Sequence, residues 1–257
     1  MTWEYLLIFG AALLAGAING IAGGGSFILF PALLYVGIPP ITANATNAIA
    51  LLPGTLASAG AYYREFQHDR RSLIRVCILG VIGGLLGAVL LLRTPPASFL
   101  QILPYLLLVA TLAFTFSNKL TRWVEGQQVY FAKLQGLKNV LVIVLQLVVA
   151  VYGGFFGGGM GILFLASFAL MGMTNIHRMN AYKVILTSCI NAVIIIPFVV
   201  ADVILWREWA IAAIGASIGG YISAYYAQKI APIIVRRFVI IIGSVMTLYF
   251  FARSWFG

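Results

Sequence analysis

Two glycine triplets interrupt apolar stretches of the chain and could bind an anion. The first, Gly23 to Gly25, lies in GAINGIAGGGSFILFP, and the second, Gly157 to Gly159, lies in GGFFGGGMGILF. Glycine has little helix propensity and tolerates positive φ, so the backbone can turn there and expose its own N–H groups. A helix that begins just after such a break directs free N–H groups and the positive end of its dipole at the break. The sequence therefore predicts two backbone anion sites.

Polar side chains near these breaks are expected to complete the sites. Ser26 directly follows the first triplet and is expected to cap the next helix, while Asn19 lies nearby. The apolar segment after each break also carries polar groups that could orient an oxyanion by hydrogen bonding. The predicted substrate-binding residues are Asn19, Gly24, Gly25, Ser26, Asn44, Thr46 and Asn47 in the first half, and Gly158, Gly159, Gly161, Asn180 and Lys183 in the second.

Lys183 is the cation expected to balance the charge of the anion. If a helix begins at Asn175, Lys183 lies about 12 Å along it, and its ammonium could approach the membrane midplane. In the alternative, the flexible stem carries the charge back to the cytoplasmic interface. The sequence favours neither position of the ammonium.

A simpler interpretation of the glycines is that they let membrane helices pack closely. Against it stands the register of the two triplets, because an offset of 134 residues places Gly23 on Gly157 and also places Ile28 to Phe30 on Ile162 to Phe164. Glycine-interrupted apolar segments at corresponding positions of two halves are typical of a transporter binding site at a repeat interface. We therefore favour a binding role for both breaks.

Composition identifies the chain as a polytopic membrane protein. Hydrophobic residues make up 62% of its 257 residues and charged residues 9%, and the mean hydropathy is +1.04. The net charge of +10 lies mostly in short gaps between apolar runs, where the positive-inside rule explains it, so nucleic acid is not an expected partner. No catalytic triad, metal-ligand cluster or phosphate loop is evident, so we predict no enzyme activity, no metal and no cofactor. Cys77 and Cys189 are expected to be small packing residues.

The apolar runs predict an all-α fold of two inverted-topology repeats, each a Gly-broken re-entrant hairpin followed by three transmembrane helices. Crossing the hydrocarbon takes about 20 apolar residues, and the arms Phe27 to Val36 and Met160 to Gly172 are too short to cross alone. The expected long runs are 2–22, 41–63, 72–92, 97–116, 139–156, 175–200, 209–228 and 238–256. Residues 1–117 and 139–257 are the expected repeats, and 118–138 the cytoplasmic linker between them. The basic residues in the gaps predict that both termini lie outside.

The two glycine regions together resemble a known family. They read GIAGGGSFILFPALLYVGIPPITANATNA and GGFFGGGMGILFLASFALMGMTNIHRMNAYK, which are similar to the TauE/SafE family of sulfite exporters, and the resemblance covers nearly the whole chain. It implies that the substrate is sulfite, a sulfonate such as sulfoacetate, or a related small sulfur oxyanion. The second copy departs from the first at Leu165, which stands where the first copy has Pro31.

The expected function is export of a small sulfur-containing anion by alternating access across the bacterial cell (inner) membrane. All 6 acidic residues lie at span ends or in loops, which weighs against proton or sodium coupling. The potential of a negative-inside cell drives anions outward without coupling. Two alternatives stay open, an ion-coupled importer of sulfur oxyanions and a non-transporting membrane assembly subunit. The expected partners are the anion and the lipid bilayer, with a homodimer as one possible assembly.

Overall fold

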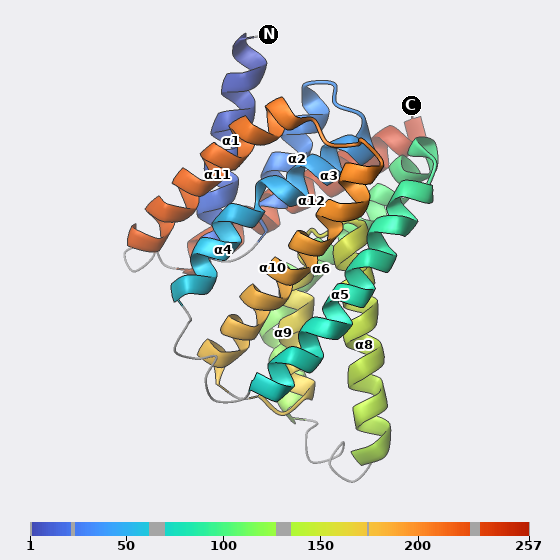
Figure 1. Cartoon of the computed structure of the whole chain (residues 1–257), viewed down its shortest axis with the longest axis vertical. Helices are drawn as coiled ribbons and strands as arrows, with labels where there is room; N and C mark the ends of the chain where they lie inside the picture. Colours follow the sequence, from blue (N-terminus) through green and yellow to red (C-terminus); the bar gives the residue numbers. More distant parts are fainter. Residues whose placement is uncertain are drawn as a thin grey trace.

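Every regular element in the described part of the chain is an α-helix, as the sequence predicts (Figure 1). The structure is a computed structural model that describes residues 2–21, 24–61, 70–126, 135–173, 175–226 and 232–256. Its helices are α1 (Thr2–Ile21), α2 (Ser26–Tyr35), α3 (Pro40–Ala50), α4 (Leu52–Ala61), α5 (Arg70–Arg93), α6 (Pro96–Gly126), α8 (Gln135–Phe155), α9 (Met160–Leu170), α10 (Ile176–Val200), α11 (Trp206–Tyr226) and α12 (Pro232–Phe256). Gly23 and part of the expected linker, residues 127–134, lie outside the described residues.

Short helices follow both glycine breaks. α2 has 10 residues and α9 has 11, which is too few to cross a bilayer at a rise of about 1.5 Å per residue. Each packs against the long helix that precedes it, α2 against α1 and α9 against α8. The short helices expected after the breaks are thus present.

The run 41–63, expected as one span, is divided into α3 and α4. Leu51 forms a turn between them, and its N–H donates to the Asn47 carbonyl at 3.2 Å. Pro53 explains the division, because proline has no N–H and its ring clashes with the carbonyl four residues earlier in a continuous helix. The expectation of a single helix here is therefore wrong, whereas α10, which follows the second short arm, runs unbroken from Ile176 to Val200.

α5 turns large apolar side chains outward and glycines inward. Its exposed face carries a residue every four positions, each between 47% and 57% exposed: Ile74, Ile78, Ile82, Leu86 and Leu90. Its buried face holds Gly80, Gly83, Gly84 and Gly87. This arrangement suits a helix with lipid outside and tight helix packing inside. Among the described residues, three helical stretches are long and apolar enough to cross a membrane: Arg70–Arg93, Pro96–Phe116 and Arg178–Val200.

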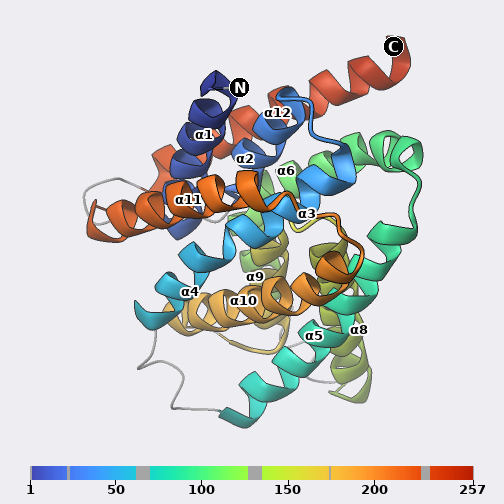
Figure 2. The same cartoon turned by 45° about the horizontal axis from the view of Figure 1, so that its top comes forward.

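The most extensive helix contacts join segments far apart in the sequence. α1 packs along α11, and α5 packs along α8 (Figure 1, Figure 2). Small residues permit both contacts, since Gly16 lies against the backbone of Ala216 and Gly154 against the backbone of Gly84. A side chain at either glycine would meet the neighbouring backbone, so the two helices of each pair could not approach so closely.

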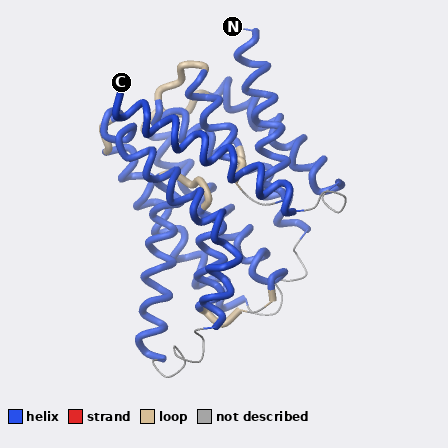
Figure 3. The backbone as a smooth tube through the Cα atoms, turned by 180° about the vertical axis from the view of Figure 1, so that it is seen from behind, coloured by secondary structure: helices blue, strands red, loops and turns tan. Residues whose placement is uncertain are grey.

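Both ends of the chain lie toward the same end of the molecule (Figure 3). Near the start of the chain, the Trp3 ring packs edge-on against the Tyr35 ring at the end of α2, with 6.4 Å between their centroids. Trp3 is 53% exposed and Tyr35 is 74% exposed. Exposed tryptophan and tyrosine are enriched where a membrane protein meets the headgroup layer, which assigns this end of α1 and α2 to an interface.

Candidate functional site

The first glycine break ends at Gly24 and Gly25. Gly24 has φ of +102°, a conformation that glycine adopts without strain. Gly25 is the N-cap of α2 and makes no side-chain cap bond, so the expectation that Ser26 caps this helix is wrong. The reason is that Gly25 already has helical angles, φ −54° and ψ −29°, which makes Ser26 the first residue inside the helix. The N–H groups of Gly25 and Ser26 donate to no described residue.

The second break is a tighter turn with two left-handed glycines. Gly157 has φ of +80° and Gly159, the N-cap of α9, has φ of +75°. The Tyr152 hydroxyl donates to the Gly158 carbonyl at 2.6 Å and thereby holds that oxygen away from the turn's free N–H groups. Within the described residues, the N–H groups of Gly158, Gly159 and Gly161 donate no hydrogen bond. These are the N–H groups that the sequence predicts to bind an anion.

The two breaks lie against neighbouring turns of α6. A Cβ added to Gly24 would lie 2.6 Å from the Phe114 ring, and one added to Gly159 would lie 3.1 Å from the Ala110 Cβ. Ala110 and Phe114 are one helical turn apart, a rise of about 6 Å. The two breaks are therefore close in space although they are far apart in the sequence.

A direct aromatic contact also joins the two breaks. The ring of Phe30, on α2, packs edge-on against the ring of Phe156, in the second break, with 5.7 Å between their centroids. Both side chains are buried. The short helix that follows the first break thus packs directly against the second break.

Lys183 lies beside the start of α9. Its stem covers Gly161, because a Cβ added there would lie 3.1 Å from the Lys183 Cδ. Its ammonium donates to the Asn180 Oδ1 at 3.0 Å. The helix that carries both residues begins at Ile176, next to Asn175, whose Oδ1 accepts from the Arg178 N–H at 3.2 Å. No carboxylate among the described residues pairs with Lys183.

The asparagines of α3 bring unsatisfied polar groups into the interior. Asn44 is 2% exposed and donates through Nδ2 to the Phe155 carbonyl, at the end of α8, at 2.9 Å. Among the described residues, its Oδ1 has no hydrogen-bond partner, and neither has either amide atom of Asn47, which is 1% exposed. An unsatisfied buried polar group costs about 1–3 kcal/mol, so these amides favour a bound ligand or water.

The remaining predicted residues separate into two places. Asn19 lies beside the first break, since a Cβ added to Gly25 would be 3.2 Å from the Asn19 Cβ. The Thr46 hydroxyl instead accepts from the Leu205 N–H at 3.4 Å and links α3 to the segment before α11. Its role in anion binding stays a prediction.

Sequence reasoning missed several groups that shape this region. The face of α6 formed by Leu106, Ala110 and Phe114 carries no polar signal, and Tyr152 stands in an uninterrupted apolar run, so only the packing identifies them. The spacing of the cysteines also predicts no pairing, yet the side chains of Cys77 on α5 and Cys189 on α10 lie close enough to interact. Both are free cysteines.

Comparisons with known proteins find related sequences along nearly the whole chain. A family model described as "Sulfite exporter TauE/SafE" matches residues 8–250. A "Probable membrane transporter protein" of Haemophilus influenzae is 29% identical over 252 residues, covering 97% of this chain and 96% of the relative. "Probable membrane transporter protein ORF9" of a Sinorhizobium species is 25% identical, covering 97% and 95%. "Probable membrane transporter protein YfcA" of Escherichia coli K12 is 24% identical, covering 94% and 87%. No solved structure matches.

Proposed function

Because this chain belongs to the TauE/SafE family of membrane transporters, we propose that it exports a small sulfur-containing anion across the bacterial inner membrane. The substrate is sulfite or a sulfonate such as sulfoacetate. The observation that carries the proposal is the convergence of two glycine breaks on α6, with the unpaired charge of Lys183 beside one of them.

The second break supplies the donors that an oxyanion needs. The free N–H groups of Gly158, Gly159 and Gly161 stand at the positive end of the α9 dipole, which favours a negative charge. Lys183 neutralises that charge, and Asn180 holds the ammonium in place. The amide of Asn44, anchored on Phe155 at the same break, offers further hydrogen bonding. The first break adds the N–H groups of Gly25 and Ser26, with Asn19 beside them.

Alternating access is the proposed mechanism, and the helix contacts support two inverted repeats. The contact of α1 with α11 has a counterpart in that of α8 with α5, and the contact of α2 with α3 has one in that of α9 with α10. In this correspondence α1 matches α8, α2 matches α9, α3 matches α10, α5 matches α11 and α6 matches α12. The contact of α6 with α12 is therefore its own counterpart. Two related halves around one site can open to either side in turn. In this arrangement both termini lie outside and residues 118–138 connect the repeats in the cytoplasm.

Two rival functions make different predictions. An ion-coupled importer takes up the anion into vesicles of known orientation only when a proton or sodium gradient is present. A non-transporting assembly subunit binds no anion after purification. Export without coupling is favoured because all 6 acidic residues lie at span ends or in loops.

The test is anion binding to the detergent-purified protein. Sulfite and sulfoacetate are titrated against the native chain and Lys183→Met, with sulfate and chloride as competing anions. We expect selective binding by the native chain and a loss of about tenfold or more in Lys183→Met, because a hydrogen bond to a charged group contributes about 1.5–3 kcal/mol.

The matched control is Arg93→Met, which removes an exposed cation at the end of α5. It should bind as the native chain does. Native affinity in Lys183→Met, with its melting temperature unchanged, would remove Lys183 from the site. No binding of any of these anions by the native chain would contradict the proposed substrate class.

A further inference from the structure

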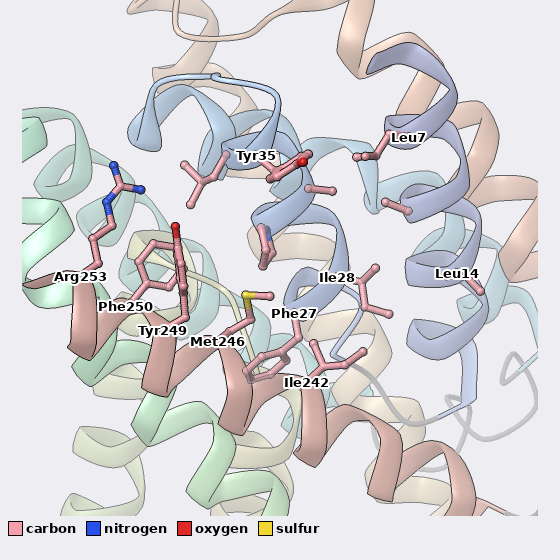
Figure 4. Close-up of a pocket in the computed structure, with 14 residues that line it drawn as sticks. Leu7, Leu14, Phe27, Ile28, Tyr35, Ile242, Met246, Tyr249, Phe250 and Arg253 are labelled. Carbon is pink, nitrogen blue, oxygen red and sulfur yellow. The ribbon is translucent and has the colours of Figure 1, made fainter. Parts of the chain in front are cut away.

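A groove of about 760 Å³ runs along the outside of the helix bundle between α1, α2 and α12 (Figure 4). α2 forms its floor, and α1 and α12 form its sides. Its walls are mostly apolar, with Ile28 of α2 and Ile242 of α12 at one end. A small oxyanion would lose its hydration at this end without replacement, so this end is not the anion site proposed above.

The chemistry of the groove changes along its length. Along α12, the groove is lined in turn by Ile242, Met246, Tyr249 and the guanidinium of Arg253 (Figure 4). Tyr35, at the end of α2, lies at the same end of the groove as Arg253 and packs against Trp3. No carboxylate among the described residues pairs with Arg253. The groove is therefore apolar at one end and cationic, with tyrosine hydroxyls, at the other.

The length of the groove matches one leaflet of a bilayer. Ile242 and Arg253 are 11 residues apart, a rise of about 16 Å, and half of the hydrocarbon core is about 15 Å thick. The aromatic pair of Trp3 and Tyr35 independently assigns the Arg253 end to the headgroup layer. The groove thus extends from a membrane interface to mid-depth.

We propose that this groove binds one anionic phospholipid. One acyl chain lies along α2 between α1 and α12, and the headgroup phosphate sits on Arg253. Charge decides the class of occupant, because an unpaired guanidinium at the interface end attracts an anionic headgroup. The lipid also contacts the arm that leaves the first break, since Phe27 lines the groove and its ring packs edge-on against Phe114.

Native mass spectrometry of the whole detergent-purified chain tests this, with phosphatidylglycerol and phosphatidylcholine titrated separately. We expect one bound phosphatidylglycerol per chain and weaker binding of phosphatidylcholine. Arg253→Gln should weaken phosphatidylglycerol binding about fivefold, because one arginine near an anionic surface contributes about 1 kcal/mol. Arg93→Gln removes an exposed cation at another helix end and should bind as the native chain does.

A second variant tests the apolar part of the groove. Ala32 lines the floor of the groove. Ala32→Phe would fill the space of the acyl chain and should abolish the binding of both phosphatidylglycerol and phosphatidylcholine. Native binding in both Arg253→Gln and Ala32→Phe would overturn the proposal. A lipid-free dimer that Ala32→Phe separates into single chains would overturn it as well, because a second copy of the chain would then occupy the groove.

Discussion

Asn47 is buried with no hydrogen bond to either of its amide atoms, whereas Asn44, one turn earlier, uses its Nδ2 to hold the Phe155 carbonyl. The two asparagines therefore differ in what the fold gains from them. An unsatisfied buried amide lowers stability, so retaining one at the centre of the molecule is consistent with a ligand-binding role. Asn44 stabilises the fold, because it pairs a carbonyl at the end of α8 that has no partner within its own helix.

Replacing each asparagine by leucine should separate these roles. Asn44→Leu leaves the Phe155 carbonyl unpaired and should lower the free energy of unfolding by about 1 kcal/mol. Asn47→Leu removes two unsatisfied groups, so it should leave the melting temperature equal or higher while weakening sulfite binding. Thermal unfolding in detergent and a binding titration measure the two effects. A large loss of stability in Asn47→Leu with native binding would assign that residue to the fold alone.

The residue types predicted the contact between the second break and Lys183, but they did not predict the contact of Thr46. The glycines after the second break and the lysine on the next helix were singled out from the sequence, and Gly161 does contact the Lys183 stem. The contact of Thr46 could not be predicted in the same way, because its bond to Leu205 joins residues 159 apart in the chain. Such a contact follows from the packing of α3 on α11, which no local pattern encodes.

At the scale of elements, a glycine with positive φ lies at each end of α9. Gly159 has φ of +75° and lies against Ala110, while Gly172, at the other end of α9, has φ of +92° with open space around it. Both positions suit glycine for conformational reasons, and only Gly159 also lies in the proposed site.

Alanine at these two glycines should therefore have different consequences. Each substitution should lower the free energy of unfolding by about 1–2 kcal/mol, the cost of a left-handed conformation in a residue with a Cβ. Gly159→Ala should also reduce sulfite binding and flux, because its new methyl group presses on Ala110 and shifts the free N–H groups. Gly172→Ala should retain native binding per folded molecule. Equal losses of binding in the two variants would show that strain alone accounts for the effect.

The helices were predictable to the extent that hydropathy and turn residues define them. The long runs and the two short arms follow from apolar length and from glycine. The division between α3 and α4 could not be predicted, although Pro53 is visible in the sequence. Membrane helices often continue through a proline when neighbouring groups satisfy the freed carbonyl. Whether a given proline divides a helix depends on that tertiary surrounding.

At the scale of the whole molecule, the contact of Cys77 with Cys189 joins the two halves of the chain. α5 belongs to the first half and α10 to the second, and they pack through Gly80 against Leu186 and Gly84 against Ile190. The small-residue face of α5 packs tightly against these partners. Its partners could not be identified, because a glycine face indicates close approach without saying which helix approaches.

Chemical cross-linking tests this packing. In a chain with a protease site inserted between Gly126 and Gln135, a thiol oxidant or a short bifunctional maleimide should link Cys77 to Cys189. After proteolysis, the linked halves should migrate together on a non-reducing gel, and Cys77→Ser should let them separate. Separation of the halves in the unsubstituted chain after treatment would contradict the contact between α5 and α10.

α6 gives the two glycine breaks a common support. Because Gly24 rests on Phe114 and Gly159 on Ala110, a movement of α6 carries both turns with it. The hydrogen bonds of a single helical turn fix the rise between those two residues. We therefore expect the thermal displacements of the two breaks to be correlated, so that the distance between the turns varies less than the position of either one. In the proposed site, that separation limits the size of the anion that both sets of N–H groups can hold at once.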